Sequence, residues 1–304
     1  MTVALIFPGQ GSQQVGMGQE LLNHPAGKAV FQEANDALGF DLQRLCLEGP
    51  EDELTLTYNT QAAILTVSTA AHRVLAERVA LTPVAVAGHS LGEYSALVAV
   101  GALDFADAVR TVHQRGTFMQ QATPVGMGAM AAILGMEAAA LEALCEQEAQ
   151  GQVVSPANYN TPGQIVISGH AAAVQRVLAK AKGKLLTVSA PFHCALMQPA
   201  ADRMRDVLAA LDFRDAATPV VANATNEALD KAAQFPPSLE AQITAPVRWD
   251  TGVQAMVARG ASQFIELGHG KVLSGMMRRI DKSATSLQVG DEASLAATLQ
   301  ALGA

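Results

Sequence analysis

Short apolar runs alternate with longer amphipathic segments along the chain. Residues 3–7 and 84–87 have the length and composition of buried strands, and residues 13–22 and 91–100, which follow them, repeat apolar positions at helical spacing. Strands that alternate with helices in this way are typical of parallel βαβ units. The pattern therefore predicts an α/β fold built on a parallel sheet. Further helices are expected at residues 61–78, 105–121, 195–211 and 249–259, and further strands at 219–222 and 263–266.

The middle of the chain follows a different order. The expected elements are strands at 129–134, 153–157, 164–168 and 185–189 and helices at 138–147 and 171–181. This βαββαβ order is ferredoxin-like. Because elements of the first kind resume after Phe192, we predict a large α/β domain made of residues 1–125 and 193–304. Residues 126–192 would form a small inserted domain, with a cleft between the two.

Composition limits the class of protein. Half of the 304 residues are hydrophobic and 16% are charged, which is typical of a globular protein with a substantial core. No apolar stretch approaches the roughly 20 residues of a membrane span, and no basic segment precedes the apolar run at the N-terminus. We therefore expect a cytoplasmic protein with no membrane segment and no signal peptide.

Cysteine content and net charge exclude further classes. The three scattered cysteines, Cys46, Cys145 and Cys194, suit neither a disulfide framework nor a structural zinc site, so we expect reduced thiols and no metal. The formal net charge of −8 argues against binding to nucleic acids.

Ser90 lies at the centre of the sequence Gly-His-Ser-Leu-Gly, residues 88–92, between an expected strand and an expected helix. In that context the G-x-S-x-G motif forms a sharp turn that exposes a nucleophilic serine at the N-terminus of a helix. The helix dipole there favours developing negative charge, and small residues beside the serine allow the close backbone packing of the turn. The alternative is a serine that only caps the helix.

A nucleophilic serine needs N–H donors for the oxyanion of its tetrahedral intermediate. The backbone N–H of Leu91, directly after Ser90, is one candidate. The second is the N–H of Gln10, in the glycine-rich segment 8–13 that follows the first strand. An ordinary turn explains that segment equally well.

The general base must come from one of seven histidines. His193 follows the last strand of the middle segment, where the chain returns to the cleft. His89 is next to Ser90, but its side chain should point elsewhere from a tight turn. Periodicity alone does not choose among the histidines, although the others are more typical of surface or turn positions: His24, His72, His113, His170 and His269.

A carboxylate partner for the histidine is missing from the sequence. No acidic residue occurs from Gly151 to Ala201, where the order Ser, acid, His of an α/β-hydrolase would place one. The pattern favours a Ser-His pair whose imidazole is held by an uncharged acceptor such as a backbone carbonyl.

Arg115 lies on the apolar face of the helix expected at 105–121, at helical spacing from Val112 and Met119. A buried guanidinium needs an anionic partner, and its planar fork matches a substrate carboxylate. The alternative is a structural ion pair with a distant Asp or Glu. Arg110 lies on another face and is expected in solvent.

Taken together, these residues resemble the malonyl-CoA:acyl-carrier-protein transacylase family, which includes the acyltransferase domains of fatty-acid and polyketide synthases. The resemblance covers essentially the whole chain and rests on ordered motifs at residues 7–13, 88–94, 114–116, 128–132, 158–164, 193–197 and 246–249. It implies a hydrolase-like core with a parallel β-sheet and an inserted ferredoxin-like βαββαβ subdomain. It also implies transfer of a malonyl group from malonyl-CoA, a substrate used without any cofactor, to the phosphopantetheine thiol of acyl carrier protein.

The same resemblance assigns catalytic roles by position. Ser90 corresponds to the nucleophile and His193 to the base. Gln10 and Leu91 correspond to the oxyanion donors. Gln242 falls where the family uses a main-chain carbonyl to orient the histidine, which accounts for the missing acid.

Substrate contacts are implied as well. Arg115 corresponds to the residue that holds the free malonyl carboxylate, and His89, Phe192 and Asn158 are expected to bind substrate. Phe192 favours malonyl, because members that accept methylmalonyl tend to carry a smaller residue there. His269 departs from the proline expected in many members and puts nothing catalytic in doubt.

The carrier protein of such systems is acidic, so a chain with net negative charge would need a local basic patch to bind it. The candidate docking residues are Arg176, Lys180, Lys182 and Lys184 in the middle segment and Lys271, Arg278, Arg279 and Lys282 near the C-terminus. Scattered solvated charges explain these residues equally well.

Other functions stay open at this point. A serine thioesterase or esterase would use the same turn, although the absent acid and the inward Arg115 count against it. An acyltransferase with a different extender preference and a carrier-binding module with a decayed site are further alternatives, and an intact Ser90 and His193 argue against the module.

Overall fold

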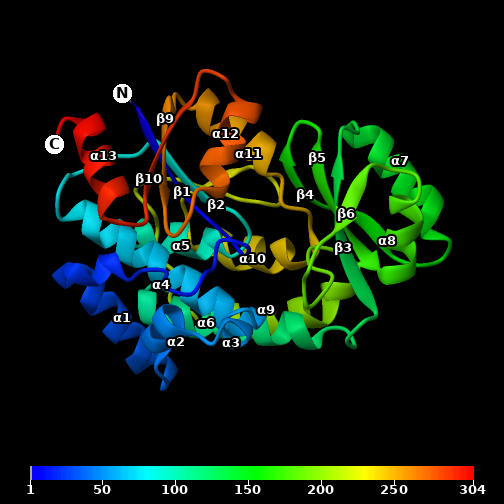
Figure 1. Ribbon diagram of the computed structural model, residues 1–304, viewed down its shortest axis with the longest axis horizontal. Helices are drawn as coiled ribbons and strands as arrows, with labels where there is room; N and C mark the ends of the chain where they lie inside the picture. The colour runs from blue at the N-terminus through cyan, green and yellow to red at the C-terminus, as the bar shows by residue number, and fades with distance from the viewer. Residues whose placement is uncertain (1) are drawn as a thin grey trace.

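The computed structural model describes residues 2–304 and contains two separate β-sheets (Figure 1). The larger sheet has six strands in the order β10-β9-β1-β2-β7-β8. Their bounds are β1 (Val3–Phe7), β2 (Ala85–Gly88), β7 (Val220–Val221), β8 (Ala228–Leu229), β9 (Gln263–Leu267) and β10 (Thr285–Val289). Neighbouring strands are parallel except for β7 and β8, which confirms an α/β fold with a mainly parallel sheet.

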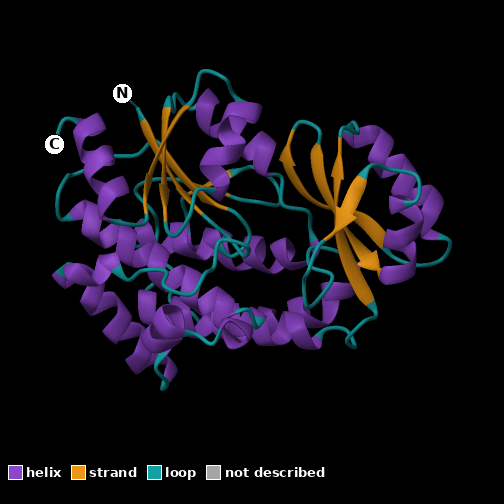
Figure 2. Cartoon of the chain, viewed as in Figure 1, coloured by secondary structure: helices purple, strands orange, loops and turns teal. Residues whose placement is uncertain are grey.

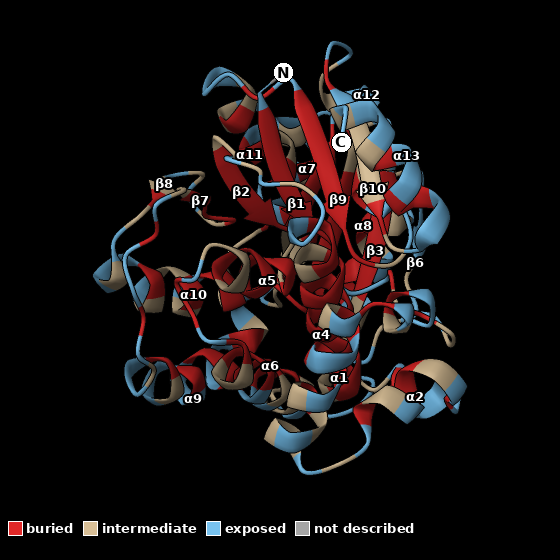
Figure 3. Cartoon of the chain, turned by 90° about the vertical axis from the view of Figure 1, so that its left-hand side faces the viewer, coloured by how far each residue is buried: buried red, intermediate tan, exposed pale blue. Residues whose placement is uncertain are grey.

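Helices cover both faces of this sheet (Figure 3). Leu5 and Phe7 of β1 pack into the apolar cluster on one face, and Ala4 and Ile6 pack into the cluster on the other. This alternation is the twofold repeat of a strand, and it leaves every residue of β1 buried. The helices are α1 (Pro25–Leu38), α2 (Leu42–Glu48), α3 (Glu51–Leu54), α4 (Thr57–Ala76), α5 (Gly92–Ala99), α6 (Phe105–Gln121), α9 (Gln198–Ala209), α10 (Phe235–Thr244), α11 (Trp249–Ala258), α12 (Val272–Ile280) and α13 (Glu292–Leu302), with short 3-10 helices η1 (Glu20–Asn23), η2 (Ala195–Met197) and η3 (Ala232–Gln234).

The smaller sheet is antiparallel, with strand order β4-β5-β3-β6 (Figure 2). Its strands are β3 (Gly128–Leu134), β4 (Val154–Thr161), β5 (Gln164–His170) and β6 (Gly183–Leu185), and its helices are α7 (Ala138–Ala149) and α8 (Ala171–Leu178). The chain order is βαββαβ, as the sequence pattern predicts. Ile133, Leu141 and Ile167 belong to an apolar cluster of this subdomain alone.

The two sheets are joined beside α11. Tyr159 of β4 donates its backbone N–H to the carbonyl of Val247 at 2.8 Å, and the N–H of Val247 donates to the carbonyl of Ala157 at 2.8 Å. These bonds fix β4 against the segment that leads into α11, so side chains from both sheets can line one cavity.

Two expected elements differ in the structure. Residues 13–22 do not form the expected helix, because Gly16 and Gly18 take left-handed φ angles of 94° and 82°, which an α-helix cannot contain. The strand expected at 185–189 lies earlier, as β6, and Leu186 and Val188 line a cavity instead. The pattern did not predict several further elements, namely the helices α1, α2, α3, α10, α12 and α13 and the strands β8 and β10.

Candidate active site

Ser90 occupies the sharp turn between β2 and α5, with a left-handed φ of 52°. A Cβ on Gly88 would lie 1.9 Å from the carbonyl carbon of Gly92, and a Cβ on Gly92 would lie 2.2 Å from the carbonyl oxygen of Phe7. Both glycines are therefore required by the close backbone packing of the turn. This is the strained strand-to-helix geometry that exposes a nucleophilic serine.

Asn223 holds the turn in place. Its Oδ1 accepts from the N–H of Ser90 at 2.6 Å, and its Nδ2 donates to the carbonyl of Gly88 at 2.7 Å. No motif in the sequence marks this residue. Its position directly after a strand parallel to β2 was the available signal, because the carboxyl ends of parallel strands meet at one edge of the sheet.

His193 lies within hydrogen-bond reach of Ser90. The Ser90 Oγ and His193 Nε2 atoms are 2.7 Å apart, and His193 Nδ1 lies 2.9 Å from the carbonyl oxygen of Gln242. Because a carbonyl can only accept, Nδ1 carries the proton and Nε2 is free to accept the proton of the serine hydroxyl. The uncharged acceptor expected from the missing acid is thus this carbonyl.

Burial keeps the imidazole neutral. The side chain of His193 is enclosed, and desolvation together with the charge of Arg115 lowers its pKa from 6.5 to about 3. A neutral imidazole is the form that can act as a general base.

Arg115 projects from α6 toward Ser90 and His193, with 1% of its surface exposed. Its Nη1 donates to Gln61 Oε1 at 2.8 Å, and its Nη2 donates to Gln242 Oε1 at 2.9 Å and to Ser90 Oγ at 3.2 Å. No Asp or Glu in residues 2–304 forms an ion pair with it, so the alternative of a structural ion pair is wrong. Burial lowers the pKa of the guanidinium, which nevertheless stays charged in proteins.

A cavity opens beside these three side chains at the carboxyl edge of the larger sheet. The lining also includes Gln10, His89, Leu91, Asn158 and Phe192, so the structure brings together every expected site residue except Gln242. Gln242 does not line the cavity but contacts Arg115 and His193, which do. Among the backbone hydrogen bonds of the turns, loops and caps in residues 2–304, none uses the N–H of Gln10 or of Leu91 as a donor. Both donors therefore remain available at the cavity.

His89 is bound by its neighbours. Its Nε2 lies 2.9 Å from Asn160 Oδ1, its ring packs against Trp249 with 5.7 Å between centroids, and burial lowers its pKa. These contacts hold Nε2 of His89 against Asn160, whereas Ser90 has its hydrogen bond to His193. Of the other histidines, His24 lies 3.1 Å from Glu292, and His269 lies 3.4 Å from Gln14.

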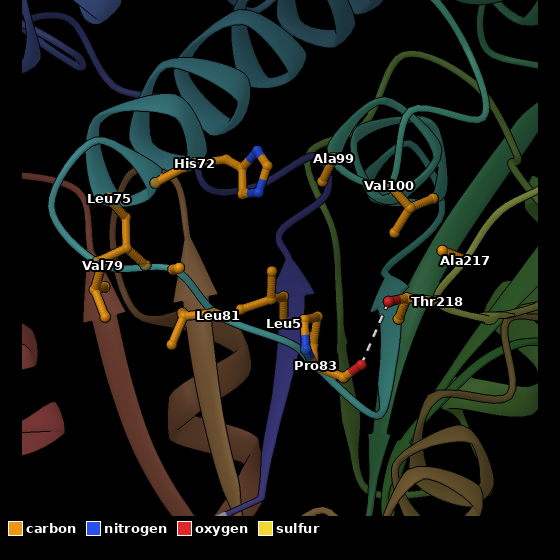
Figure 4. Close-up of a pocket in the computed structure, with 12 residues that line it drawn as sticks. Leu5, His72, Leu75, Val79, Leu81, Pro83, Ala99, Val100, Ala217 and Thr218 are labelled. Carbon is orange, nitrogen blue, oxygen red and sulfur yellow. Dashed lines mark hydrogen bonds between the residues drawn. The ribbon is translucent and has the colours of Figure 1, made fainter.

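A second cavity lies at the opposite, amino edge of the same sheet (Figure 4). Pro83 and Thr218, which precede β2 and β7, line it, and Thr218 Oγ1 donates to the Pro83 carbonyl at 3.4 Å. His72 also faces it, with its pKa lowered to about 4 by burial. The lining contains neither Ser nor Cys, and the hydroxyl of Thr218 donates to a backbone carbonyl and not to a histidine, so the cavity shows no pairing of a hydroxyl with a base.

Among residues 2–304, no cluster of three or more His, Cys, Asp or Glu side chains is arranged to hold a metal ion. No helix within that range combines the length and apolar character needed to span a membrane.

The chain is similar to known proteins over nearly its full length. A family model described as "Acyl transferase domain" matches residues 4–301. The malonyl CoA-acyl carrier protein transacylase of Escherichia coli strain K12 is 46% identical over 304 residues, covering 98% of both chains. An acyl carrier protein S-malonyltransferase from Vibrio cholerae gives a TM-score of 0.95 at 44% identity, covering 98% of this chain and 100% of that one.

A third comparison includes a partner protein. A malonyl-transacylase solved in complex with a type II PKS acyl-carrier protein gives a TM-score of 0.96 at 43% identity and covers 99% of this chain and 100% of that one. These similarities extend over nearly the full length of the chain. The chain therefore belongs to the acyl transferase domain family, among the malonyl CoA-acyl carrier protein transacylases.

Proposed function

We propose that this chain transfers a malonyl group from malonyl-CoA to acyl carrier protein through an ester on Ser90, which supplies chain extension in fatty-acid or polyketide synthesis. The observation that carries this proposal is the position of Arg115. Its Nη2 lies 3.2 Å from the Ser90 Oγ, beside the 2.7 Å contact of that oxygen with His193 Nε2. A serine nucleophile with a buried guanidinium beside it suits an acyl group that carries its own carboxylate.

The first half-reaction begins at the Ser90 hydroxyl. His193 Nε2 takes the hydroxyl proton as Oγ attacks the malonyl thioester carbonyl. The N–H groups of Gln10 and Leu91 stabilise the oxyanion that forms. The C–S bond then breaks, and the coenzyme A thiolate takes the proton back from His193.

The second half-reaction reverses this order. The phosphopantetheine thiol of the carrier protein gives its proton to His193 and attacks the malonyl ester. The Ser90 oxygen leaves and recovers the proton. Since one thioester replaces another without a change of oxidation state, malonyl-CoA is a substrate and no cofactor takes part.

Arg115 selects the acyl group. Its present partners are three neutral oxygens, and a malonyl carboxylate would give the guanidinium an anionic partner in a cavity shielded from water. An acetyl group would leave that charge without one, which costs binding free energy. Phe192, which is buried and lines the cavity, is proposed to disfavour bulkier extenders such as methylmalonyl.

The carrier protein is proposed to dock through α12 and its flanks. Arg176 donates to the carbonyls of Glu148 and Ala149, and Lys180 pairs with Glu148, so these two cations already have partners within the subdomain. Arg278 and Arg279 are exposed on the last turn of α12. Lys271 precedes the first turn of this helix, after β9 at the carboxyl edge of the sheet where Ser90 lies, and Arg278 and Arg279 lie at the other end of the helix. Lys182, Lys184, Lys271 and Lys282 complete the proposed docking set.

We propose that residues 1–125 with 193–304 and residues 126–192 behave as two domains. The smaller segment has an apolar cluster of its own, and further residues of it, such as Met130 and Val166, pack into the cluster of the larger domain. We also propose that the protein acts in the cytoplasm, where its substrates are made.

The test of the proposed function is the intact mass of the protein after brief mixing with malonyl-CoA, for the native chain and for Ser90→Ala. We expect a malonyl-sized adduct on the native chain, discharged by holo carrier protein and missing in Ser90→Ala. Free malonate without a lasting adduct would favour a thioesterase or esterase instead. Carrier binding without any adduct would favour a binding module.

A further inference from the structure

Glu93 is a buried carboxylate that the reaction described above does not use. It lies in the first turn of α5, three residues after Ser90, and 2% of its surface is exposed. Its Oε2 accepts from Gln242 Nε2 at 2.7 Å and from the backbone N–H of Asn223 at 3.0 Å. It does not line the cavity, so any effect on catalysis must pass through these two residues.

Gln242 connects the three groups of the proposed mechanism. Its carbonyl oxygen accepts from His193 Nδ1 at 2.9 Å, and its side-chain Oε1 accepts from Arg115 Nη2 at 2.9 Å. Its Nε2 donates to the carbonyl of Ser90 at 3.0 Å as well as to Glu93. A shift of Gln242 would therefore move both His193, the proposed base, and Arg115, the proposed partner of the malonyl carboxylate.

The orientation of the Gln242 amide depends on what lies on each side. An amide presents an acceptor at one end and a donor at the other, and Arg115 can only donate. A carboxylate at position 93 can only accept, so it holds Nε2 on its own side and turns Oε1 toward Arg115. The reversed amide would place two donors against each other at Arg115 and two acceptors against each other at Glu93.

Asn223 extends the same arrangement to the nucleophile. Glu93 accepts from its backbone N–H, while its side chain holds the N–H of Ser90 and the carbonyl of Gly88. Burial raises the pKa of Glu93 to about 7, and the hydrogen bonds from Gln242 and Asn223 and the charge of Arg115 limit that rise. In its ionised form, Glu93 is an opposite charge linked to Arg115 through the Gln242 amide.

We propose that Glu93 is a positioning residue for acyl transfer, whose carboxylate fixes the Gln242 amide and thereby aims Arg115 at the acyl carboxylate and His193 at Ser90. This inference rests on the proposed function. It differs from a purely structural role, in which a buried acid near a helix N-terminus only stabilises the fold.

Glu93→Gln tests the proposal because it keeps the shape, removes the negative charge, and leaves a single oxygen that must accept from both Gln242 and Asn223. The loading rates of malonyl-CoA and acetyl-CoA are measured in the absence of carrier protein. We expect kcat/KM for malonyl loading to fall roughly 10- to 100-fold, as for groups displaced by a fraction of an ångström to an ångström. Acetyl loading should fall less, because it loses the alignment of His193 but not the contact with Arg115. Glu93→Asp should restore part of the malonyl preference.

Glu266 offers a matched control. It is also a buried carboxylate, and it accepts from the backbone N–H groups of Leu273 at 3.0 Å and Ser274 at 2.7 Å, away from the cavity. Glu266→Gln should lower the melting temperature and leave the malonyl-to-acetyl ratio unchanged.

The outcomes separate the two proposals. A native chain that forms no malonyl adduct overturns the proposed function. A native chain that forms it, with Glu93→Gln showing the native malonyl-to-acetyl ratio and native rates, overturns only the role of Glu93. A fall in melting temperature with an unchanged ratio, as in Glu266→Gln, would also assign Glu93 a purely structural role. If Glu93→Gln does not fold, the ratio in Glu93→Asp decides.

Discussion

Replacing Arg115 with alanine removes the guanidinium that lines the cavity beside Ser90. In the proposed mechanism, this group pairs with the free carboxylate of malonyl but has no counterpart on acetyl. The two acyl groups should therefore respond differently, which separates recognition of the carboxylate from general damage to the site.

The size of the effect follows from burial. Arg115 is 1% exposed, so its pairing with a carboxylate would be almost fully desolvated. Truncating one partner of a buried, hydrogen-bonded charge pair costs about 2–5 kcal/mol. Since about 1.4 kcal/mol is a factor of ten, kcat/KM for malonyl loading should fall roughly 30- to 4,000-fold.

Acetyl loading gives the contrast. Arg115 donates to Ser90 Oγ at 3.2 Å and lowers the pKa of His193, and the variant loses both effects. These changes leave the contact between Ser90 and His193 in place, so acetyl loading should stay within about tenfold of the native rate, against a much larger loss for malonyl. The oxygens of Gln61 and Gln242 lose a donor, so stability should fall by about 1–3 kcal/mol.

The assay is the rate of adduct formation by intact mass with malonyl-CoA and with acetyl-CoA. Arg110→Ala is the matched control, because Arg110 lies on the same helix but is exposed and pairs with Asp107 at 2.7 Å. Equal losses for the two acyl groups in a folded Arg115→Ala protein would refute the proposal that Arg115 binds the malonyl carboxylate. An unchanged malonyl rate would refute it as well.

Three further outcomes are expected. The pKa of His193 is lowered from 6.5 to about 3, so its neutral form contributes stability that is fully present above pH 6.5 and is lost as the pH falls toward 3. Chemical denaturation at a series of pH values should show this loss of stability. A His193→Ala variant should show less of it. Asn223→Ala should lower stability by roughly 2–4 kcal/mol and slow malonyl loading, because the buried N–H of Ser90 and carbonyl of Gly88 lose their partner. Chemical denaturation measures the stability, and the rate of adduct formation measures the loading. Native values of the two would contradict the role of Asn223. Reversing the charge at Arg278 and Arg279 should raise KM for carrier protein while leaving KM for malonyl-CoA unchanged, and an unchanged carrier KM would remove these residues from the docking surface.

Much of the fold could be predicted from periodicity because local sequence determines it. The helix expected at 105–121 matches α6, and the βαββαβ order of the middle segment matches the second sheet. Residues 13–22 were mistaken for a helix because their apolar spacing is helical, while Gly16 and Gly18 allow left-handed turns that the spacing does not reveal.

The site could be predicted where a motif or a resemblance marked it, as for Ser90 and Arg115. Asn223 and Glu93 were missed because their roles arise from contacts between distant segments. Asn223 contacts Ser90 across 133 positions of the chain, and Glu93 contacts Gln242 across 149. No local pattern encodes such pairs.

The uncharged acceptor on His193 has a consequence for substrate choice. A carboxylate in the place of the Gln242 carbonyl would lie close to Arg115, because Gln242 contacts both His193 and Arg115. It would pair with the guanidinium and compete with the malonyl carboxylate for it. The carbonyl orients the imidazole without adding negative charge, and the buried acid, Glu93, lies on the far side of the Gln242 amide. This arrangement leaves Arg115 charged, partnered only by neutral oxygens and available to a substrate that brings its own anion.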